Sequence, residues 1–382
     1  MDDHQPIDTP PRAAAHAPGG LARCRHQLAH PLRAAAHWLA RVDPGTHRRV
    51  KGLRLVTAYG IAAALGALHD ITRGVPGSAV LGTLAAAFAL WASVHEARTA
   101  RPDSARDLAL LCVAIGVGAS IYVVLTPFGS HLGRGGAEAA LVIGAFLVGY
   151  MKRFFGVLGA GLGSMFFIGQ LYAYSLRLTP VDLPTIGIAV LIAALASIVP
   201  RMLSGPAERP ALLAALSAVP AGVAKRWQPE FVMGLQAATA SAVVVLLNAL
   251  IGLEESVWAV TAAVYVVAGS ASGTMQRVRR RIVGTLIGVP LGIACLPLAE
   301  HAPLLVWAMA ALAMVVYAMS MPERYDIACG AFAFVLVVTL AINGMHSIEF
   351  LLARAWETLI GGALGLAAAM FIFPLRAIQP DR

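Results

Sequence analysis

Charged residues are scarce in this chain. Only 13% of its 382 residues are Asp, Glu, Lys or Arg, against about a quarter in ordinary soluble domains. Hydrophobic residues supply 58%, and the mean hydropathy is +0.74. These values exclude a soluble globular protein. At roughly 20 residues for each bilayer crossing, the apolar residues are enough for about eleven membrane spans.

The chain also lacks the motifs of several enzyme classes. It has no Gly-Lys dipeptide, which excludes a Walker A loop and direct ATP drive on this chain, and neither G-x-S-x-G nor H-E-x-x-H. Its four cysteines are scattered and imply no disulfide framework. Cys24, His26 and His30 have weak spacing for zinc. We therefore expect no enzyme activity, no cofactor and no bound metal.

The apolar runs predict an all-α polytopic bundle of about twelve spans in two six-helix halves. The first six spans are expected near 53–69, 77–94, 107–126, 136–151, 154–174 and 184–200. The second six are expected near 231–252, 256–273, 281–299, 302–320, 326–343 and 348–373.

Five regions follow from this division. Residues 1–52 form a basic cytoplasmic tail, which is either an interfacial helix or a solvated arm. Residues 53–200 form the first membrane half, and residues 201–230, with four prolines and a charge cluster, form a cytoplasmic linker. Residues 231–376 form the second membrane half, and residues 377–382 a cytoplasmic C-terminus.

The positive charges indicate the orientation. The net charge of +9 would suggest nucleic-acid binding in a soluble protein, but here the basic residues fall in short loops, so membrane topology explains them better. With a cytoplasmic N-terminus, 25 of the 29 Lys and Arg residues lie on the inner side. The exceptions are Arg73, Arg134, Arg177 and Arg354. Both termini are therefore expected in the cytoplasm, with no nucleic-acid partner.

Two internal repeats are visible. The segment SARDLALLCVAIGVGAS in the third span resembles RRRIVGTLIGVPLGIA in the ninth, as expected for two similar halves. Within the second half, the pattern R-x3-T-x2-G-x3-G occurs in the ninth and twelfth spans, which run in opposite directions. It therefore suggests inverted three-helix repeats, although a chance alignment of membrane-helix glycines is the alternative. The matched residues are Arg281, Thr285, Gly288 and Gly292, and Arg354, Thr358, Gly361 and Gly365.

Arg354 and Glu357 are two charges inside the expected last span. Intramembrane ionisable residues usually face a cavity or a partner. In the functional interpretation, Arg354 attracts the carboxylate of an anionic substrate and Glu357 exchanges a proton. The alternative is that the two, at i and i+3, neutralise each other and anchor the helix.

Other polar groups have a functional and a structural interpretation. Arg277, Arg279, Arg280 and Arg281 would steer anions to the cytoplasmic mouth of the ninth span, or simply anchor it. The rings of Trp258 and Tyr265 share a helix face and would stack on an aromatic substrate, unless Trp258 is an interfacial belt residue. The glycine ridges are expected to be close helix contacts. Further polar residues of the second half include Gln236 and Tyr317, and Gln170, Tyr172 and Tyr174 form a polar patch without an assigned role in the first half.

Residues 226–376 resemble the membrane domain of the fusaric acid resistance and aromatic acid exporter superfamily. The resemblance is carried by the segments SVWAVTAAVYV, RRRIVGTLIGVPLG and RAWETLIGGALGLAAAMFIFP. In the first half, Arg106 stands where the first Arg would, but no Thr follows at the fourth position. The resemblance implies proton-driven efflux of small organic anions, often aromatic carboxylic acids, across a bacterial inner membrane, sometimes with a periplasmic adaptor protein. Only Arg281, Thr285, Arg354 and Thr358 are transferred from it, as substrate-binding candidates.

The leading hypothesis is a proton-coupled exporter of aromatic or other organic acids. The alternatives are a passive organic-anion channel and a non-transporting membrane scaffold of an envelope complex. The expected partners are a small organic anion, the lipid bilayer, an adaptor and a second copy of the chain. The substrate-binding candidates are Arg354, Thr358, Arg281, Thr285, Trp258, Tyr265 and Gln236, and Glu357 is the proton-coupling candidate.

Overall fold

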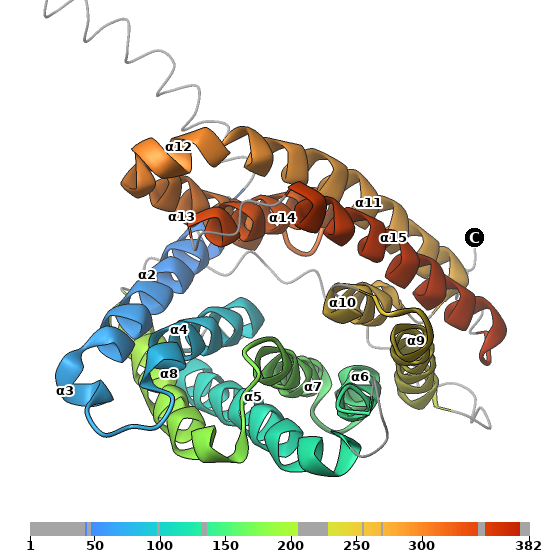
Figure 1. Cartoon of the computed structure of the whole chain (residues 1–382), viewed down its shortest axis with the longest axis horizontal. Helices are drawn as coiled ribbons and strands as arrows, with labels where there is room; N and C mark the ends of the chain where they lie inside the picture. Colours follow the sequence, from blue (N-terminus) through green and yellow to red (C-terminus); the bar gives the residue numbers. More distant parts are fainter. Residues whose placement is uncertain are drawn as a thin grey trace, which may run out of the picture. The chain divides into compact units, whose positions relative to one another are not determined.

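The computed structural model describes residue 43 and residues 47–97, 100–130, 136–204, 228–253, 256–268, 270–342 and 348–374 (Figure 1). For residues 130, 299–300, 340–342 and 348–355 only the backbone is described. The chain divides into two units, Met1–Gly45 and Thr46–Arg382, and all the elements discussed here belong to the second. Helices and their connections make up the described residues, and no strand occurs among them.

Six helices coincide with the first six expected spans. The apolar runs form helices because a membrane-embedded backbone must satisfy its hydrogen bonds within the segment. The short α3 (His69–Thr72) and the 3₁₀ turn η1 (Pro180–Asp182) connect them. The six helices are α2 (His47–Ala67), α4 (Ser78–His95), α5 (Arg101–Ser130), α6 (Ala139–Tyr150), α7 (Lys152–Ser175) and α8 (Leu183–Leu203).

Six further helices coincide with the second six expected spans, and the short α12 (Leu296–His301) lies between two of them. They are α9 (Pro229–Ile251), α10 (Ser256–Val266), α11 (Ala271–Ala294), α13 (Pro303–Ser320), α14 (Tyr325–Ile342) and α15 (Ile348–Phe371).

The boundary between α10 and α11 differs most from the prediction. The helix α10 ends at Val266 rather than at 273, and α11 begins at Ala271 rather than at 281. The Ser270 side chain caps α11 by accepting a hydrogen bond from the Gly273 amide. The Arg277 guanidinium reaches back and donates to the Val267 carbonyl at 2.9 Å. The helix cap and this backbone contact therefore set the boundary. The run of arginines that begins at Arg277 lies inside α11, although the hydropathy pattern predicted a loop before residue 281.

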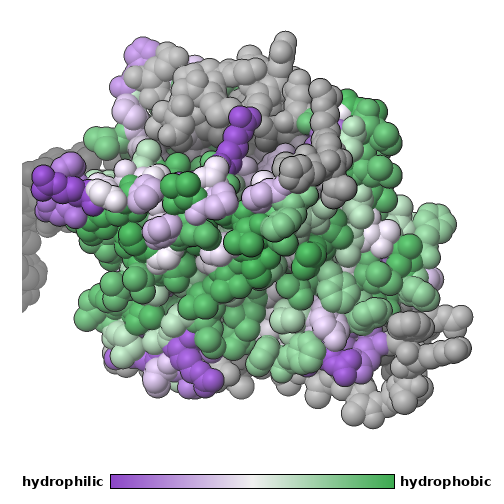
Figure 2. Space-filling view, turned by 60° about the horizontal axis from the view of Figure 1, so that its bottom comes forward, coloured by the Kyte–Doolittle hydropathy of each residue, from purple (hydrophilic) through white to green (hydrophobic). Residues whose placement is uncertain are grey.

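Seven helices of the described part are long and apolar enough to cross a membrane: α2, α4, α5, α7, α8 with η1, α9 and α13. Shorter apolar helices include α6, α10 and parts of α14 and α15. On the face shown in Figure 2, hydrophobic residues form a broad band and hydrophilic residues gather toward its edges. The chain is an integral membrane protein, and its twelve-span count stays a prediction.

The same helix pairs occur in both halves. In the first half α2 packs on α4, α4 on α8, α5 on α7 and α6 on α7. At the corresponding places in the second half, α9 packs on α10, α10 on α15, α11 on α14 and α13 on α14 (Figure 1). The halves contact each other through α6 with α9 and α2 with α13, which are also corresponding pairs.

Glycines allow the closest of these helix contacts. A methyl group at Gly288 of α11 would overlap the Gly330 carbonyl of α14, and one at Gly361 of α15 would overlap the Ala259 carbonyl of α10. The same holds for Gly118 of α5 against α7. The glycine ridges noted in the sequence are therefore backbone-to-backbone contacts between helices.

A buried ionic cluster ties together the first half. The Glu96 carboxylate accepts from the Arg54 guanidinium at 3.0 Å and from the Arg201 Nε at 2.7 Å, and from the Ser104 hydroxyl. Arg201 is only 2% exposed and Glu96 only 6%. The Lys51 ammonium donates to the Glu96 backbone carbonyl at 2.6 Å. These contacts join the N-terminal parts of α2 and α5 to the C-terminal ends of α4 and α8.

Candidate functional site

The candidate site is centred on Arg281 of α11. Its guanidinium donates to the Tyr325 hydroxyl of α14 at 3.4 Å. Tyr265 of α10, Tyr317 of α13 and Cys329 of α14 lie near Arg281. Four helices of the second half therefore bring their polar groups together around one arginine.

Aromatic rings extend this group into the first half. The Trp91 ring of α4 lies 5.5 Å from Phe332 of α14 and 6.4 Å from Tyr317, both edge-on. The Tyr265 ring lies 6.1 Å from Phe167 of α7. These spacings are those of interacting aromatic pairs. The site therefore lies where the two halves meet, with rings contributed by both.

Arg281 has an unusual electrostatic setting for a membrane protein. Among the described residues, no carboxylate lies within ion-pair distance of it. Its Nε is buried and has no hydrogen-bond partner in the described part of the chain. Arg281 is half-buried, and a buried N–H group without an acceptor costs free energy, so a bound anion would supply the missing partner.

The helix α10 presents two of the predicted residues. Every residue of α10 is buried except Trp258 and Tyr265, which are half-buried. The predicted shared face is therefore the one side of this helix that is not fully covered. Of the two, Tyr265 lies near Arg281.

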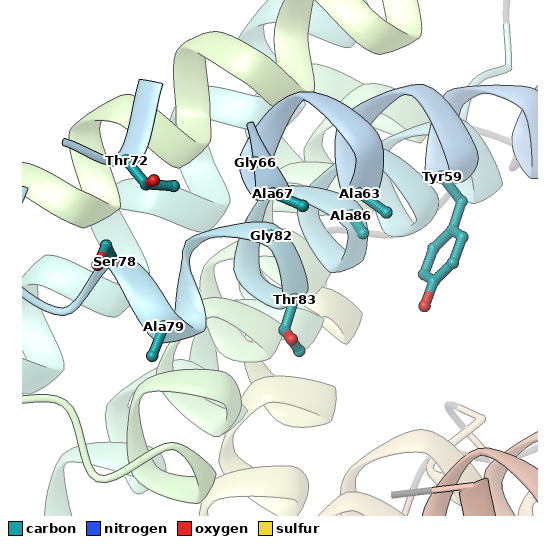
Figure 3. A pocket seen from close by; sticks show the side chains of 10 residues that line it. All are labelled: Tyr59, Ala63, Gly66, Ala67, Thr72, Ser78, Ala79, Gly82, Thr83 and Ala86. Atoms are coloured by element: carbon teal, nitrogen blue, oxygen red, sulfur yellow. The ribbon is translucent and has the colours of Figure 1, made fainter. Parts of the chain in front are cut away.

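A cavity of about 500 Å³ opens between α2 and α4. Its lining is mostly alanine and glycine, with hydroxyl groups from Tyr59, Thr72, Ser78 and Thr83. Figure 3 shows Tyr59 at one end of this lining, its ring extending away from α2.

Tyr59 links this cavity to the aromatic rings. It lies near Tyr172 of α7, whose hydroxyl accepts from the Trp91 indole at 3.2 Å. A chain of aromatic side chains therefore connects the cavity, through Trp91, to the rings around Arg281.

The remaining predicted residues take other positions. Gln236 is 1% exposed and donates to the Ile372 carbonyl at 2.8 Å, which ties α9 to the end of α15. Thr285 is half-buried on α11, one turn beyond Arg281. On α15, Glu357 and Thr358 are buried, at 2% and 9% exposure. The side chain of Arg354 lies outside the described residues.

Sequence reasoning missed Tyr325, Trp91 and Phe332 as site residues. Tyr325 opens an apolar helix in the segment ERYD, where the neighbouring charges drew attention to a helix start. Arg324 and Asp326 instead form an exposed ion pair at 2.9 Å. Trp91 lies in the first half, which lacks the R-x3-T-x2-G-x3-G pattern. Only the packing of α4 against the second half shows its role, so no local pattern could have found it.

The fold and site define a polytopic helical membrane protein with a polar and aromatic centre. The family model described as fusaric acid resistance protein-like matches residues 238–368, which run from within α9 to near the end of α15. This match supports the expected family resemblance for this region of the membrane protein. Searches of curated proteins and of solved structures give no match.

Proposed function

We propose that the protein is a secondary transporter that exports small organic anions, above all aromatic carboxylates, across the bacterial inner membrane in exchange for protons. One observation carries the proposal: Arg281 donates to the Tyr325 hydroxyl, while its buried Nε has no hydrogen-bond partner and no carboxylate lies within ion-pair distance among the described residues. The family match over residues 238–368 supports a transporter in general.

The chemistry of the site suits an aromatic acid. A guanidinium binds a carboxylate through parallel N–H groups, and the free Nε of Arg281 provides one of them. The Tyr265 and Tyr317 rings, on α10 and α13, would then contact the aromatic ring of the anion. Stacked and edge-on ring contacts contribute about 0.5–1.5 kcal/mol each beyond the buried area.

The proposed topology has twelve spans with both termini in the cytoplasm. The agreement of each expected span with a helix supports it, as does the placement of 25 of the 29 basic residues. In this topology α4, α10 and α13 run toward the cytoplasm, whereas α11 and α14 run away from it. The C-terminal ends of α4, α10 and α13 then lie toward the cytoplasmic side, and they carry Trp91, Tyr265 and Tyr317. The first parts of α11 and α14 also lie toward that side, and they carry Arg281 and Tyr325.

The internal repeats suit a transporter that alternates between two states. The corresponding helix pairs of the halves support a duplication. Within the second half, the glycines of the ninth and twelfth spans each contact the middle helix of the other three-helix unit, as α11 on α14 and α15 on α10. This reciprocal pairing supports the inverted repeat. Such repeats rock against each other around a central site.

The experiment that tests the proposal measures binding of benzoate and phthalate to the purified protein. Replacing Arg281 by Ala removes a charged hydrogen-bond donor worth about 1.5–3 kcal/mol, so affinity should fall about 10-fold to 150-fold. Arg281→Lys should restore part of it, because the charge remains but the paired N–H groups do not. The control is Arg279→Ala, which removes an exposed arginine from the same helix and should leave affinity unchanged.

Each alternative function predicts a different result. A passive channel would pass the anion at a rate that does not depend on the proton gradient. A scaffold would bind neither acid, and the Arg281 variants would matter only through stability. Equal affinity of Arg281→Ala and the wild type would refute the site.

A further inference from the structure

A second polar cluster surrounds Glu138, the residue before α6. Three side chains donate to its Oε1: the Tyr174 hydroxyl of α7 at 2.5 Å, the Asn248 amide of α9 at 2.6 Å and the Ser256 hydroxyl of α10 at 2.7 Å. Glu138 is only 3% exposed. Four helix ends from both halves therefore meet at a single carboxylate oxygen.

The other oxygen of Glu138 is different. Its Oε2 is buried and has no hydrogen-bond partner among the described residues. No Lys, Arg or His of the described part lies within ion-pair distance of this carboxylate. A buried carboxylate with a free oxygen and no cation has room to hold a proton, and such groups in membrane proteins mark proton pathways.

The position of Glu138 relative to Arg281 follows from the helix directions. Glu138 and Ser256 lie at the starts of α6 and α10, and Tyr174 and Asn248 near the ends of α7 and α9. In the proposed topology all four of these helix ends are on the outer side. The Arg281 site lies toward the inner side, so the two clusters occupy opposite ends of the interface between the halves.

We propose that Glu138 is the proton-binding residue that couples anion export to the proton gradient, with the proton held at Oε2 and taken up from the outer side. This rests on the proposed function, and it assigns the coupling role to a residue other than Glu357. Export of the anion would accompany passage of the proton from Glu138 to the cytoplasm. The donors to Oε1 keep the carboxyl group in place in both protonation states.

The titratable groups around Glu138 are two tyrosines among the described residues. Tyr174 donates to it, and Tyr122 of α5 interacts with it electrostatically. The groups from α9 and α10, Asn248 and Ser256, do not titrate.

Two neighbouring connections lie outside the described residues. One carries His131 and Arg134 before Glu138, and the other carries Glu254 and Glu255 before Ser256. Their charged residues serve as controls.

The test uses the full chain in liposomes loaded with labelled phthalate, which crosses lipid slowly because it carries two charges. Glu138→Gln keeps an acceptor for the three donors but cannot exchange a proton. Proton-driven net efflux should fall about tenfold or more, while exchange of phthalate for phthalate stays near the wild-type rate. Glu255→Gln and Arg134→Ala should leave both rates unchanged.

The outcomes separate the two proposals. If the wild type moves phthalate with the proton gradient and Glu138→Gln does so equally, Glu138 is not the coupling residue. If Glu138→Gln loses net efflux and exchange together, its role is structural, and the inference is again refuted. If the wild type shows no proton-dependent phthalate flux, the proposed function itself is refuted, and the inference about Glu138 is refuted with it.

Discussion

Replacing Glu96 by Gln should destabilise the protein strongly, because two buried arginines share this carboxylate. The ion pairs measure 3.0 Å to Arg54 and 2.7 Å to Arg201, and the side chains of all three residues are at most 8% exposed. Removing one partner of a buried ion pair lowers the free energy of unfolding by about 3–5 kcal/mol, because the other charge stays buried without its counter-ion. An amide at this position keeps one acceptor, so we expect the lower end, about 3 kcal/mol.

The matched control is Glu323→Gln. Glu323 pairs with Arg48 at 2.5 Å, but its side chain is 57% exposed. Solvent-exposed ion pairs contribute about 0–1 kcal/mol to the free energy of unfolding. In detergent, Glu96→Gln should therefore lower the melting temperature by at least about 5 °C, at about 2–4 °C for each kcal/mol, and Glu323→Gln by much less. Equal melting temperatures for the two variants would refute the reasoning that burial makes the Glu96 cluster strong.

Two further predictions concern packing and selectivity. Gly361→Ala should reduce the yield of folded protein in the membrane, because the added methyl overlaps the Ala259 carbonyl. Gly187→Ala is the control, because no atom lies within 4 Å of the added methyl, and it should leave the yield unchanged. Size-exclusion chromatography measures the folded yield of both variants. Tyr317→Leu should lower the preference for phthalate over its saturated ring analogue by about 2-fold to 10-fold, the worth of one ring contact. If the ratio of the dissociation constants for phthalate and its saturated analogue is unchanged, Tyr317 does not contact the ring of the bound anion.

The helices could be predicted from the sequence because hydropathy sets them directly. Each of the twelve expected spans coincides with a helix, and the glycine ridges are the close contacts that their spacing suggested. The boundary between α10 and α11 could not be predicted in this way. It depends on the Ser270 cap and on Arg277 binding the Val267 carbonyl, and these are local contacts that a hydropathy average does not register.

The site could be predicted only in part. Arg281 was found through the R-x3-T-x2-G-x3-G repeat and the family resemblance, and Tyr265 through the helix face that it shares with Trp258. Trp91 and Tyr325 join them through contacts between helices distant in the sequence. Glu138 lies at the start of the expected span 136–151, but no pattern in the sequence singled it out. Its importance comes from three donors on three other helices, which only the fold brings together.

The most direct test of the central claim is the accumulation of benzoate and phthalate in cells that lack their own acid exporters. Cells with the wild-type protein should accumulate less of these acids than cells without it, and a protonophore should abolish the difference. Arg281→Ala should abolish it as well at matched membrane levels, whereas Arg279→Ala should not. Export that persists in Arg281→Ala cells would contradict the account, as would wild-type cells that accumulate as much as cells without the protein.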